Sequence, residues 1–317
     1  MQPRISRILV SWLTNMDFTP NPRRGYVLGL LAYSIWGMFP LYFKTLDGTP
    51  AQEVIVHRVL WSALFSAGLL LVWRHRGWWQ ELYQHPKRFL ALTASGALIA
   101  SNWLIYVWSV HNDHLVEASL GYYISPLVNV LLAMLFLGER LRRLQWLAIA
   151  LAAIGVALQV WSLGKVPWIS LALACSFGFY GLIRKQAPVA ALPGLTVETW
   201  ILLPVALGWL WLNPQAVSMQ SEFLWSGQMF WLAAAGPVTL LPLLFFNEAA
   251  KNLPYASLAF LQYITPTVLL LLAVLVFKEP FAAESFIFFG FIWAALVVYS
   301  WDALRILKRG QKVLSGK

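Results

Sequence analysis

Three polar residues near the start of one apolar segment are the first candidates for chemistry. Glu53, His57 and Arg58 lie in residues 51–73, and Glu53 and His57 are four residues apart, on one face of a helix. A charged side chain in hydrocarbon costs about 2.5–3.5 kcal/mol on insertion scales, so it needs a partner or a function. We interpret Arg58, with His57, as the wall of a cavity that binds an anionic solute. The alternative is that Arg58 reaches the membrane interface or pairs with Glu53.

Further polar residues lie in other apolar segments. Asn102 and Tyr106 fall in residues 88–110, where they either line the same cavity or form hydrogen bonds between helices. Glu53 and Glu248 are the candidates for carrying a coupling ion, which would be a proton. For Glu248 the alternative is a solvated carboxylate near the membrane interface.

Two prolines inside apolar segments predict breaks in helices. Pro126 and Pro266 lack an N–H group, so the carbonyl four residues earlier loses its helical partner. These carbonyls belong to Tyr122 and Gln262. In hydrocarbon they need other partners, and broken backbone usually faces a protein-lined or aqueous cavity. We therefore predict a polar site framed by Tyr122, Tyr123, Gln262 and Tyr263. The alternative is a packing kink in which a neighbouring hydroxyl satisfies the carbonyl.

The segments around both prolines are copies of one another. Residues 123–126, Tyr-Ile-Ser-Pro, correspond to residues 263–266, Tyr-Ile-Thr-Pro, at an offset of 140 residues. Glu139 corresponds to Glu279 at the same offset, and Lys44 corresponds to Lys185 at an offset of 141. The chain is therefore internally duplicated, as many transporters are.

Ten apolar segments are each close to the length of about 20 residues that crosses hydrocarbon. They cover residues 25–43, 51–73, 88–110, 115–137, 144–162, 166–184, 196–212, 228–248, 255–277 and 283–301. Each copy holds five spans, an odd number, so the two copies have opposite orientations in the membrane. The predicted fold class is an all-α polytopic membrane protein with ten transmembrane helices in two inverted five-helix repeats, residues 25–162 and 166–301.

Basic residues are distributed unevenly between the two sides of these spans. Nineteen of the 23 Lys and Arg residues fall on one side, only Lys44, Lys165 and Lys278 fall on the other, and Arg58 lies inside a span. Cytoplasmic loops are enriched in basic residues. We therefore expect both termini in the cytoplasm: a tail of residues 1–24, with Met16 as an alternative start, and a basic tail of residues 302–317.

Composition and missing motifs argue against several classes of protein. The chain is 60% hydrophobic and 11% charged, whereas soluble domains are about 25% charged. The basic residues sit in short loops, which argues against nucleic-acid binding. We find no GxSxG, HExxH or phosphate-loop motif, so we predict neither an enzyme nor an ATP-driven pump, and no cofactor. His111, Asp113 and His114 lack the histidine pair of a zinc helix, so we predict no metal site.

The leading hypothesis is a secondary transporter that works by alternating access, driven by a gradient of an ion or of the solute. A channel or a scaffolding protein is the alternative, and a membrane-embedded enzyme is less favoured. The sequence leaves the oligomeric state open.

The residues also resemble a known family. The string SPLVNVLLAMLFLGERLRRLQWLAIALAAIGVAL and the arginine early in the second span resemble the EamA branch of the drug/metabolite transporter superfamily. SNWLIYVWSVHNDHLVEASLGYYISPLVNV and LPYASLAFLQYITPT are similar to its RarD-type permeases, and the resemblance covers residues 25–300. It implies a bacterial inner-membrane permease or exporter of small organic metabolites or drugs, with a link to chloramphenicol sensitivity. Lys278-Glu279-Pro280 departs from Gly138-Glu139-Arg140, so the two exits need not act alike.

Overall fold

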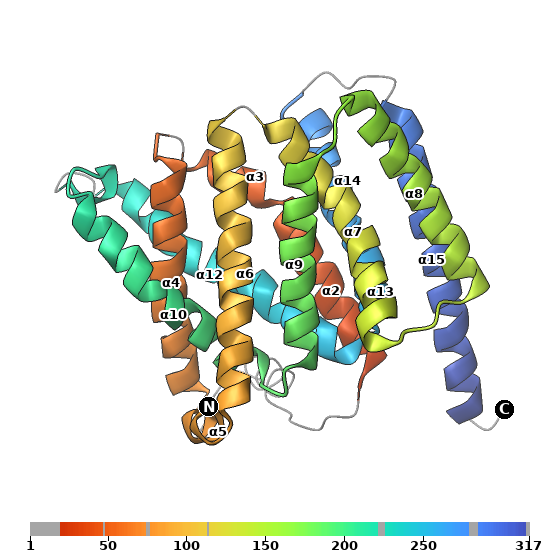
Figure 1. Ribbon diagram of the computed structural model, residues 1–317, viewed down its shortest axis with the longest axis horizontal. Helices are drawn as coiled ribbons and strands as arrows, with labels where there is room; N and C mark the ends of the chain where they lie inside the picture. Colours follow the sequence, from red (N-terminus) through yellow and green to blue (C-terminus); the bar gives the residue numbers. More distant parts are fainter. Residues whose placement is uncertain are drawn as a thin grey trace.

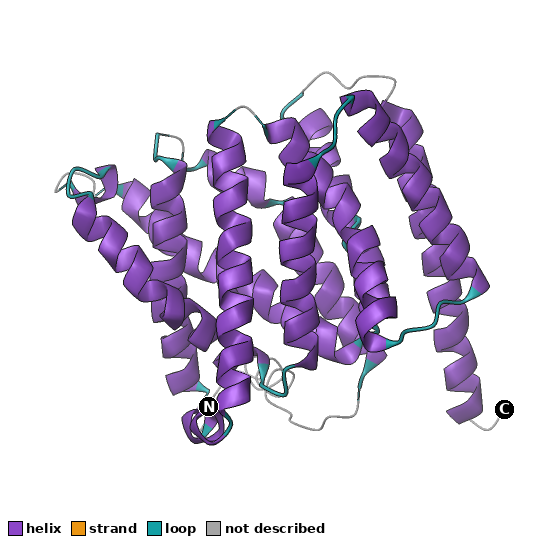
Figure 2. Cartoon of the chain, in the orientation of Figure 1, coloured by secondary structure: helices purple, strands orange, loops and turns teal. Residues whose placement is uncertain are grey.

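The computed structural model describes residues 20–46, 48–73, 77–112, 114–220, 226–278 and 285–314, and these residues form helices and loops without a strand (Figure 2). The first half contains α2 (Pro22–Gly37), α3 (Phe39–Lys44), α4 (Ala51–Val72), α5 (Trp78–Gln84), α6 (Pro86–His111), α7 (Leu115–Leu137) and α8 (Arg143–Leu163). The second half contains α9 (Trp168–Gln186), α10 (Ala191–Leu212), the 3-10 helix η1 (Val217–Met219), α12 (Gly227–Asn252), α13 (Tyr255–Leu261), α14 (Ile264–Leu271), the π-helix η2 (Leu272–Val276) and α15 (Ser285–Leu314).

Nine segments in the described part of the chain are long and apolar enough to cross a membrane. This confirms the predicted all-α polytopic membrane protein, but it is one segment fewer than the ten predicted. The segment that does not qualify is α9, which has 19 residues but carries Arg184 and Lys185 in its last turn. These two residues lower its mean hydropathy, although α9 packs in the bundle against α6 and α7 (Figure 1).

The helices alternate in direction through both halves (Figure 1). We call the end where α2 begins and α15 finishes the termini end, and the end where α4 and α7 begin the far end. α9 packs against α6 and α7, and its counterpart α2 packs against α12 and α14. The pairs α4 with α10 and α8 with α15 join each helix to its own counterpart. Equivalent helices therefore make equivalent contacts across the two halves, as an inverted repeat predicts.

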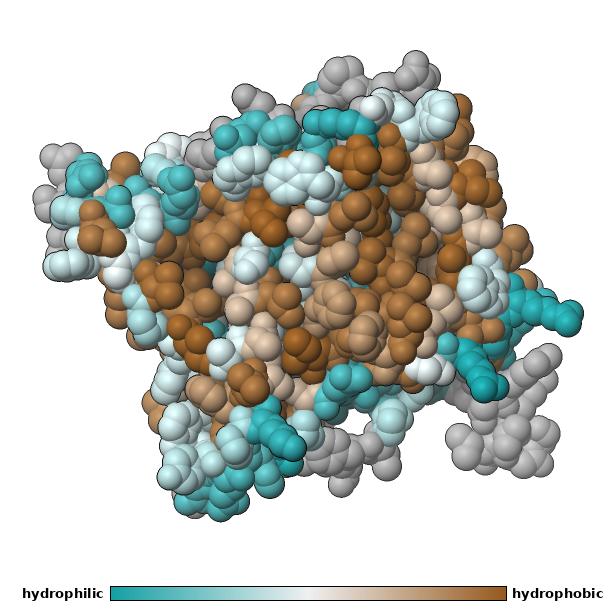
Figure 3. Space-filling model, viewed as in Figure 1, coloured by the Kyte–Doolittle hydropathy of each residue, from teal (hydrophilic) through white to brown (hydrophobic). Residues whose placement is uncertain are grey.

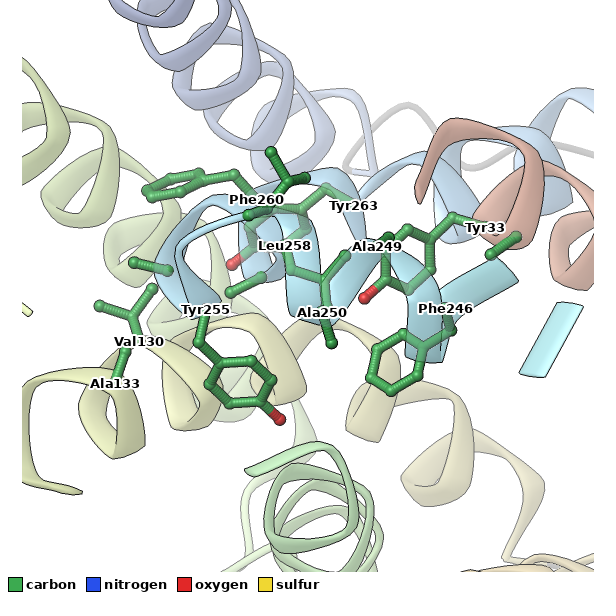
Figure 4. Packing of buried hydrophobic residues seen from close by; sticks show 14 of the residues in the cluster. Tyr33, Val130, Ala133, Phe246, Ala249, Ala250, Tyr255, Leu258, Phe260 and Tyr263 are labelled. Carbon is green, nitrogen blue, oxygen red and sulfur yellow. The ribbon is translucent and has the colours of Figure 1, made fainter. Parts of the chain in front are cut away.

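The visible surface is apolar across the middle of the bundle and hydrophilic toward the two ends (Figure 3). Leu104, Val205 and Val297 are among the large hydrophobic side chains that remain exposed. A surface of this kind is stable against lipid rather than water. The buried core lies between the central helices, where the rings of Tyr33 and Phe246 lie side by side with their centres 6.2 Å apart (Figure 4).

The end of α7 connects the two halves. Gly138, which follows the helix, has a φ of 63°. The Glu139 carboxylate then accepts the N–H groups of Tyr255 at 2.6 Å and Ala256 at 3.0 Å, at the start of α13. Lys278, the counterpart of Gly138, has a φ of 54°, so the two exits share a backbone conformation despite their different residues. Glu279 and the predicted tail residues 1–19 and 315–317 lie outside the described residues.

Candidate solute-binding site

A cavity of about 190 Å³ lies between the central helices, and both halves of the chain form its walls. The lining residues come from the C-terminal parts of α2 and α6, from α3, and from the N-terminal parts of α4, α7 and α9. Leu243 of α12 and the junction of α13 and α14 complete it. These parts of the helices are in the middle of the bundle and toward the far end, so the cavity lies on that side.

Arg58 brings a positive charge to this cavity. Its Nε donates to the Thr239 hydroxyl at 2.9 Å. The guanidinium carbon lies 4.5 Å from the ring centre of Trp103 and 5.9 Å from that of Phe39. Among the described residues, no Asp or Glu oxygen lies within 4.0 Å of the guanidinium, so it does not pair with Glu53. A half-buried guanidinium without a counter-charge is suited to binding an anion.

Four other predicted residues line the same cavity: Asn102, Tyr106, Tyr122 and Gln262. The Asn102 amide nitrogen donates to the Leu173 carbonyl and to the Ser176 hydroxyl, both at 2.9 Å. Asn102 therefore faces the cavity and also joins α6 to α9. The Gln262 amide oxygen accepts a hydrogen bond from Asn129 Nδ2 at 2.8 Å, which fixes its orientation at the cavity wall.

Three residues that we predicted to bind solute do not line the cavity. His57 is buried, and its Nδ1 accepts a hydrogen bond from Trp61 Nε1 at 3.2 Å. The Tyr123 ring packs edge-on against α15 instead. The Tyr263 hydroxyl donates to the Tyr123 carbonyl at 3.3 Å. Neighbouring residues on a helix point about 100° apart, so the neighbour of a lining residue such as Tyr122 faces elsewhere.

The two carboxylates predicted to carry a proton have structural partners. The Glu53 oxygens accept the N–H groups of Val217 and Ser218 at 3.0 and 2.9 Å, which ties α4 to the loop between α10 and α12. Glu248 pairs with Arg24 at 3.3 Å near the termini end. Neither carboxylate lines the cavity.

The two prolines occupy different local structures in the two copies. α7 continues through Pro126, whereas the second copy is interrupted at residues 262–263, shortly before Pro266. The Gln262 carbonyl accepts the N–H group of Thr265 at 3.1 Å, so the prediction that it is free was wrong. Gln262 contributes its side chain to the cavity.

Sequence reasoning missed an aromatic wall and a buried ion pair. The missed aromatic residues are Trp36, Phe39, Phe43 and Phe177. The ion pair joins Arg184 of α9 to Glu198 of α10, with Nε and Oε1 3.4 Å apart, and both side chains are buried. One signal could have revealed Glu198, because it follows Arg58 by 140 residues, which is the offset of the repeat.

The chemistry of the cavity is that of binding. Its lining combines one guanidinium, side-chain amides and aromatic rings. The described residues contain no group of three His, Cys, Asp or Glu side chains placed to hold a metal ion. A largely apolar cavity with a few polar groups, placed between two inverted repeats inside a bundle with an apolar surface, is typical of a membrane transporter.

Comparison with known proteins agrees with this class. A family model described as the EamA-like transporter family matches residues 23–161. An uncharacterized transporter of Pseudomonas aeruginosa is 62% identical over 92% of this chain and 98% of its own length. Protein RarD of Escherichia coli is 45% identical over 92% of this chain and 98% of its own length. A protein of Pseudomonas aeruginosa named chloramphenicol-sensitive protein RarD is 31% identical, over 90% of this chain and 96% of its own length.

A solved crystal structure is similar with a TM-score of 0.67 over 87% of this chain and 96% of its own. Its sequence identity of 18% supports the fold alone. The chain belongs to the EamA-like transporter family and to its RarD-type permeases. It is therefore a multi-pass membrane transporter, which confirms the family predicted from the sequence.

Proposed function

We propose that this protein is a secondary transporter that carries a small organic solute with an anionic group, and that the anionic group binds Arg58. Arg58 is the one charged residue that lines the cavity in the described part of the chain, and it has no carboxylate partner there. A carboxylate or phosphate on the solute would supply the missing charge through paired hydrogen bonds. This single observation carries the proposal.

The remainder of the cavity suits an apolar body on the same solute. Trp36, Trp103 and Phe177 present ring surfaces to the cavity, and the amides of Asn102 and Gln262 offer hydrogen bonds. Aromatic walls with a few placed polar groups are the usual composition of small-molecule sites. We therefore favour an aromatic or otherwise apolar organic anion over an inorganic ion.

The membrane is the bacterial inner membrane. The termini end lies in the cytoplasm, because the basic loops are at that end. The cavity then faces the outside, and alternating access would present it to the cytoplasm. The sequence has no ATP-binding motif, so a gradient of the solute or of an ion drives transport without chemical change of the solute. Because Glu53 and Glu248 have structural partners, we assign the coupling to neither of them.

The first prediction tests Arg58 with a pair of probes that differ in charge. Phenylacetate should raise the thermal unfolding temperature of the purified protein, and its neutral analogue phenylacetamide should raise it less. Arg58→Ala should remove the difference between the two probes because the guanidinium is what distinguishes them. Arg58→Lys should retain part of it, since a point charge replaces the paired donors.

Arg305→Ala is the matched control, because Arg305 also lies on a tryptophan ring, that of Trp301, but outside the cavity. It should keep the wild-type discrimination between the probes. Equal stabilisation by both probes, or an unchanged difference in Arg58→Ala, would contradict the proposal. Uptake of a bound solute into proteoliposomes should then saturate with concentration, whereas a channel would give a linear flux. Chloramphenicol belongs among the compounds tested, because one relative is named for sensitivity to it.

A further inference from the structure

Arg58 and Glu198 occupy the same position in the two repeats. Each is the eighth residue of its helix, α4 and α10, and the offset between them is the 140 residues of the repeat. Each also forms a hydrogen bond with a hydroxyl on the third long helix of the other repeat, and these two helices, α12 and α6, are counterparts. Arg58 Nε donates to Thr239 of α12 at 2.9 Å, and Glu198 Oε1 accepts from Ser95 of α6 at 2.5 Å.

The surroundings of these two positions differ. Arg58 is half-buried and lines the cavity, whereas Glu198 is buried and lies next to Arg184. Arg184 is fully buried, and its Nη2 donates to the Ala191 carbonyl at 3.2 Å. A Cβ added at Gly194 would clash with Arg184 Nη1, so the guanidinium packs directly on the backbone of α10. The same position thus borders the cavity toward one end of the molecule and is buried in an ion pair toward the other.

A layer of side chains lies between the cavity and this ion pair. Phe177 lines the cavity, and its ring centre is 6.0 Å from that of Tyr180, one turn further along α9. The Tyr180 ring stacks on Phe246 at 6.1 Å, and the Asn247 amide donates to the Tyr180 hydroxyl at 3.0 Å. Arg184 lies one turn beyond Tyr180. The C-terminal half of α9 therefore closes against α10 and α12 toward the termini end.

The counterpart of this layer at the far end lines the cavity. With the offset of 141 residues in the first helix of each repeat, Tyr180 corresponds to Phe39 and Arg184 corresponds to Phe43. Both phenylalanines line the cavity together with Arg58. An inverted repeat in which one copy is open and the other closed has a second state with the two exchanged.

We propose that Arg184 and Glu198 form the latch that closes the termini end, and that Phe43, the counterpart of Arg184, closing on Arg58 forms the corresponding latch at the far end, where Phe39 already lies against the guanidinium. This inference rests on the proposed alternating access. When the termini end opens, Glu198 takes the place beside the cavity that Arg58 holds now. Its negative charge then repels the anionic group of the solute and favours its release on that side.

The energetics of a buried ion pair suit a latch. Burying two charges costs about as much as their attraction returns, so the closed state gains little over one in which water reaches both charges. The contact between the two charges is also a loose one, because Arg184 Nε and Glu198 Oε1 lie 3.4 Å apart and do not form a hydrogen bond. A buried ion pair with complete hydrogen bonding would stabilise the closed conformation more strongly and disfavour opening of that end.

The test uses the full chain with Cys175→Ser and a single cysteine in place of Tyr122, which is half-buried and lines the central cavity. A membrane-impermeant maleimide should label this cysteine mainly in right-side-out vesicles. Glu198→Gln keeps the size of the side chain but leaves Arg184 unpaired, which favours the state in which water reaches it. Labelling in inside-out vesicles should rise by about fivefold or more, and labelling in right-side-out vesicles should fall.

Asp302→Asn is the control, because it breaks a different ion pair, that between Asp302 and Arg142. This pair lies near the termini end of the edge helices α8 and α15, away from the cavity. The control variant should leave both labelling rates unchanged. A second variant, Arg184→Gln with Glu198→Gln, leaves no unpaired charge and should shift the labelling in the same direction.

Two results would overturn the latch: labelling rates equal to the parent in both variants, or loss of folded protein in both, which would assign the pair to stability alone. The proposed function fails differently. If the cysteine is not labelled in right-side-out vesicles even without a further substitution, the outward-facing cavity is absent. The binding of phenylacetate by Arg58 is measured separately by thermal unfolding, so its failure would not affect this labelling test.

Discussion

Glu53 is a buried carboxylate whose two oxygens accept the N–H groups of Val217 and Ser218. A glutamine at this position has one acceptor oxygen, and its NH₂ group would face a backbone N–H. We therefore expect Glu53→Gln to lower the free energy of unfolding by about 1–3 kcal/mol, the cost of a buried group left unsatisfied. Thermal unfolding in detergent measures this loss.

The same variant separates a structural role from proton coupling. If Glu53 only fixes the loop, the pH dependence of uptake per folded molecule should equal that of the wild type. Glu248→Gln, which removes the pair with Arg24, is a suitable comparison because it was the other coupling candidate. An altered pH profile with unchanged stability in Glu53→Gln would restore the coupling role.

The sequence could predict that polar residues in apolar spans contribute to a site, but it could not predict which of their side chains face the cavity. Arg58, Asn102 and Gln262 line the cavity because a polar group in a membrane helix is stable only toward protein or water. Tyr123 and Tyr263 were predicted by adjacency in sequence, which the helical rotation of about 100° per residue contradicts. The pairing of Arg184 with Glu198 could not be predicted, since it depends on how α9 meets α10.

At the scale of helices, the two equivalent glycines Gly96 and Gly236 differ in how closely another backbone approaches. A Cβ at Gly236 would lie 2.6 Å from the carbonyl of Trp61 in α4, whereas one at Gly96 would meet Glu198 of α10 at 3.5 Å. Backbone cannot move aside as a flexible side chain can. Gly236→Ala should therefore destabilise the protein by about 1–3 kcal/mol in thermal unfolding, and Gly96→Ala should be tolerated.

Gly208 in α10 provides the control because nothing lies within 4 Å of a Cβ added there. Gly208→Ala should be neutral or stabilising by up to about 1 kcal/mol, since alanine favours the helix. If Gly96→Ala and Gly236→Ala cost the same, the asymmetry between the two helix contacts is not real.

Helix positions could be predicted because hydrocarbon demands long apolar segments, and the repeat fixed their number per copy. The prediction is least secure where packing replaces hydrophobicity. α9 lies inside the bundle and carries Arg184 and Lys185, so its sequence is less apolar than that of a lipid-facing helix. The different local structures at Pro126 and Pro266 also could not be predicted, since both copies have the same motif and differ in their surroundings.

For the whole molecule, the role of α9 decides the topology. Nine crossings would place the two ends of the chain on opposite sides of the membrane, whereas ten crossings place them on the same side. In Figure 1 the start of α2 and the end of α15 lie at the same end of the bundle. Val166 before α9 and Pro188 after it are both exposed. If α9 crosses, single cysteines at these positions should be labelled by an impermeant maleimide from opposite sides.

In the Cys175→Ser background, we expect Val166→Cys to react in right-side-out vesicles and Pro188→Cys to react in inside-out vesicles. This expectation follows from the proposed orientation, in which the basic residues at the termini end lie in the cytoplasm. Gln215→Cys, exposed at the far end after α10, should behave as Val166→Cys does. Labelling of Val166→Cys and Pro188→Cys from one side would mean that α9 does not cross. The two halves could then not be inverted copies, and neither the exchange of open and closed ends nor the latch at Arg184 and Glu198 would follow.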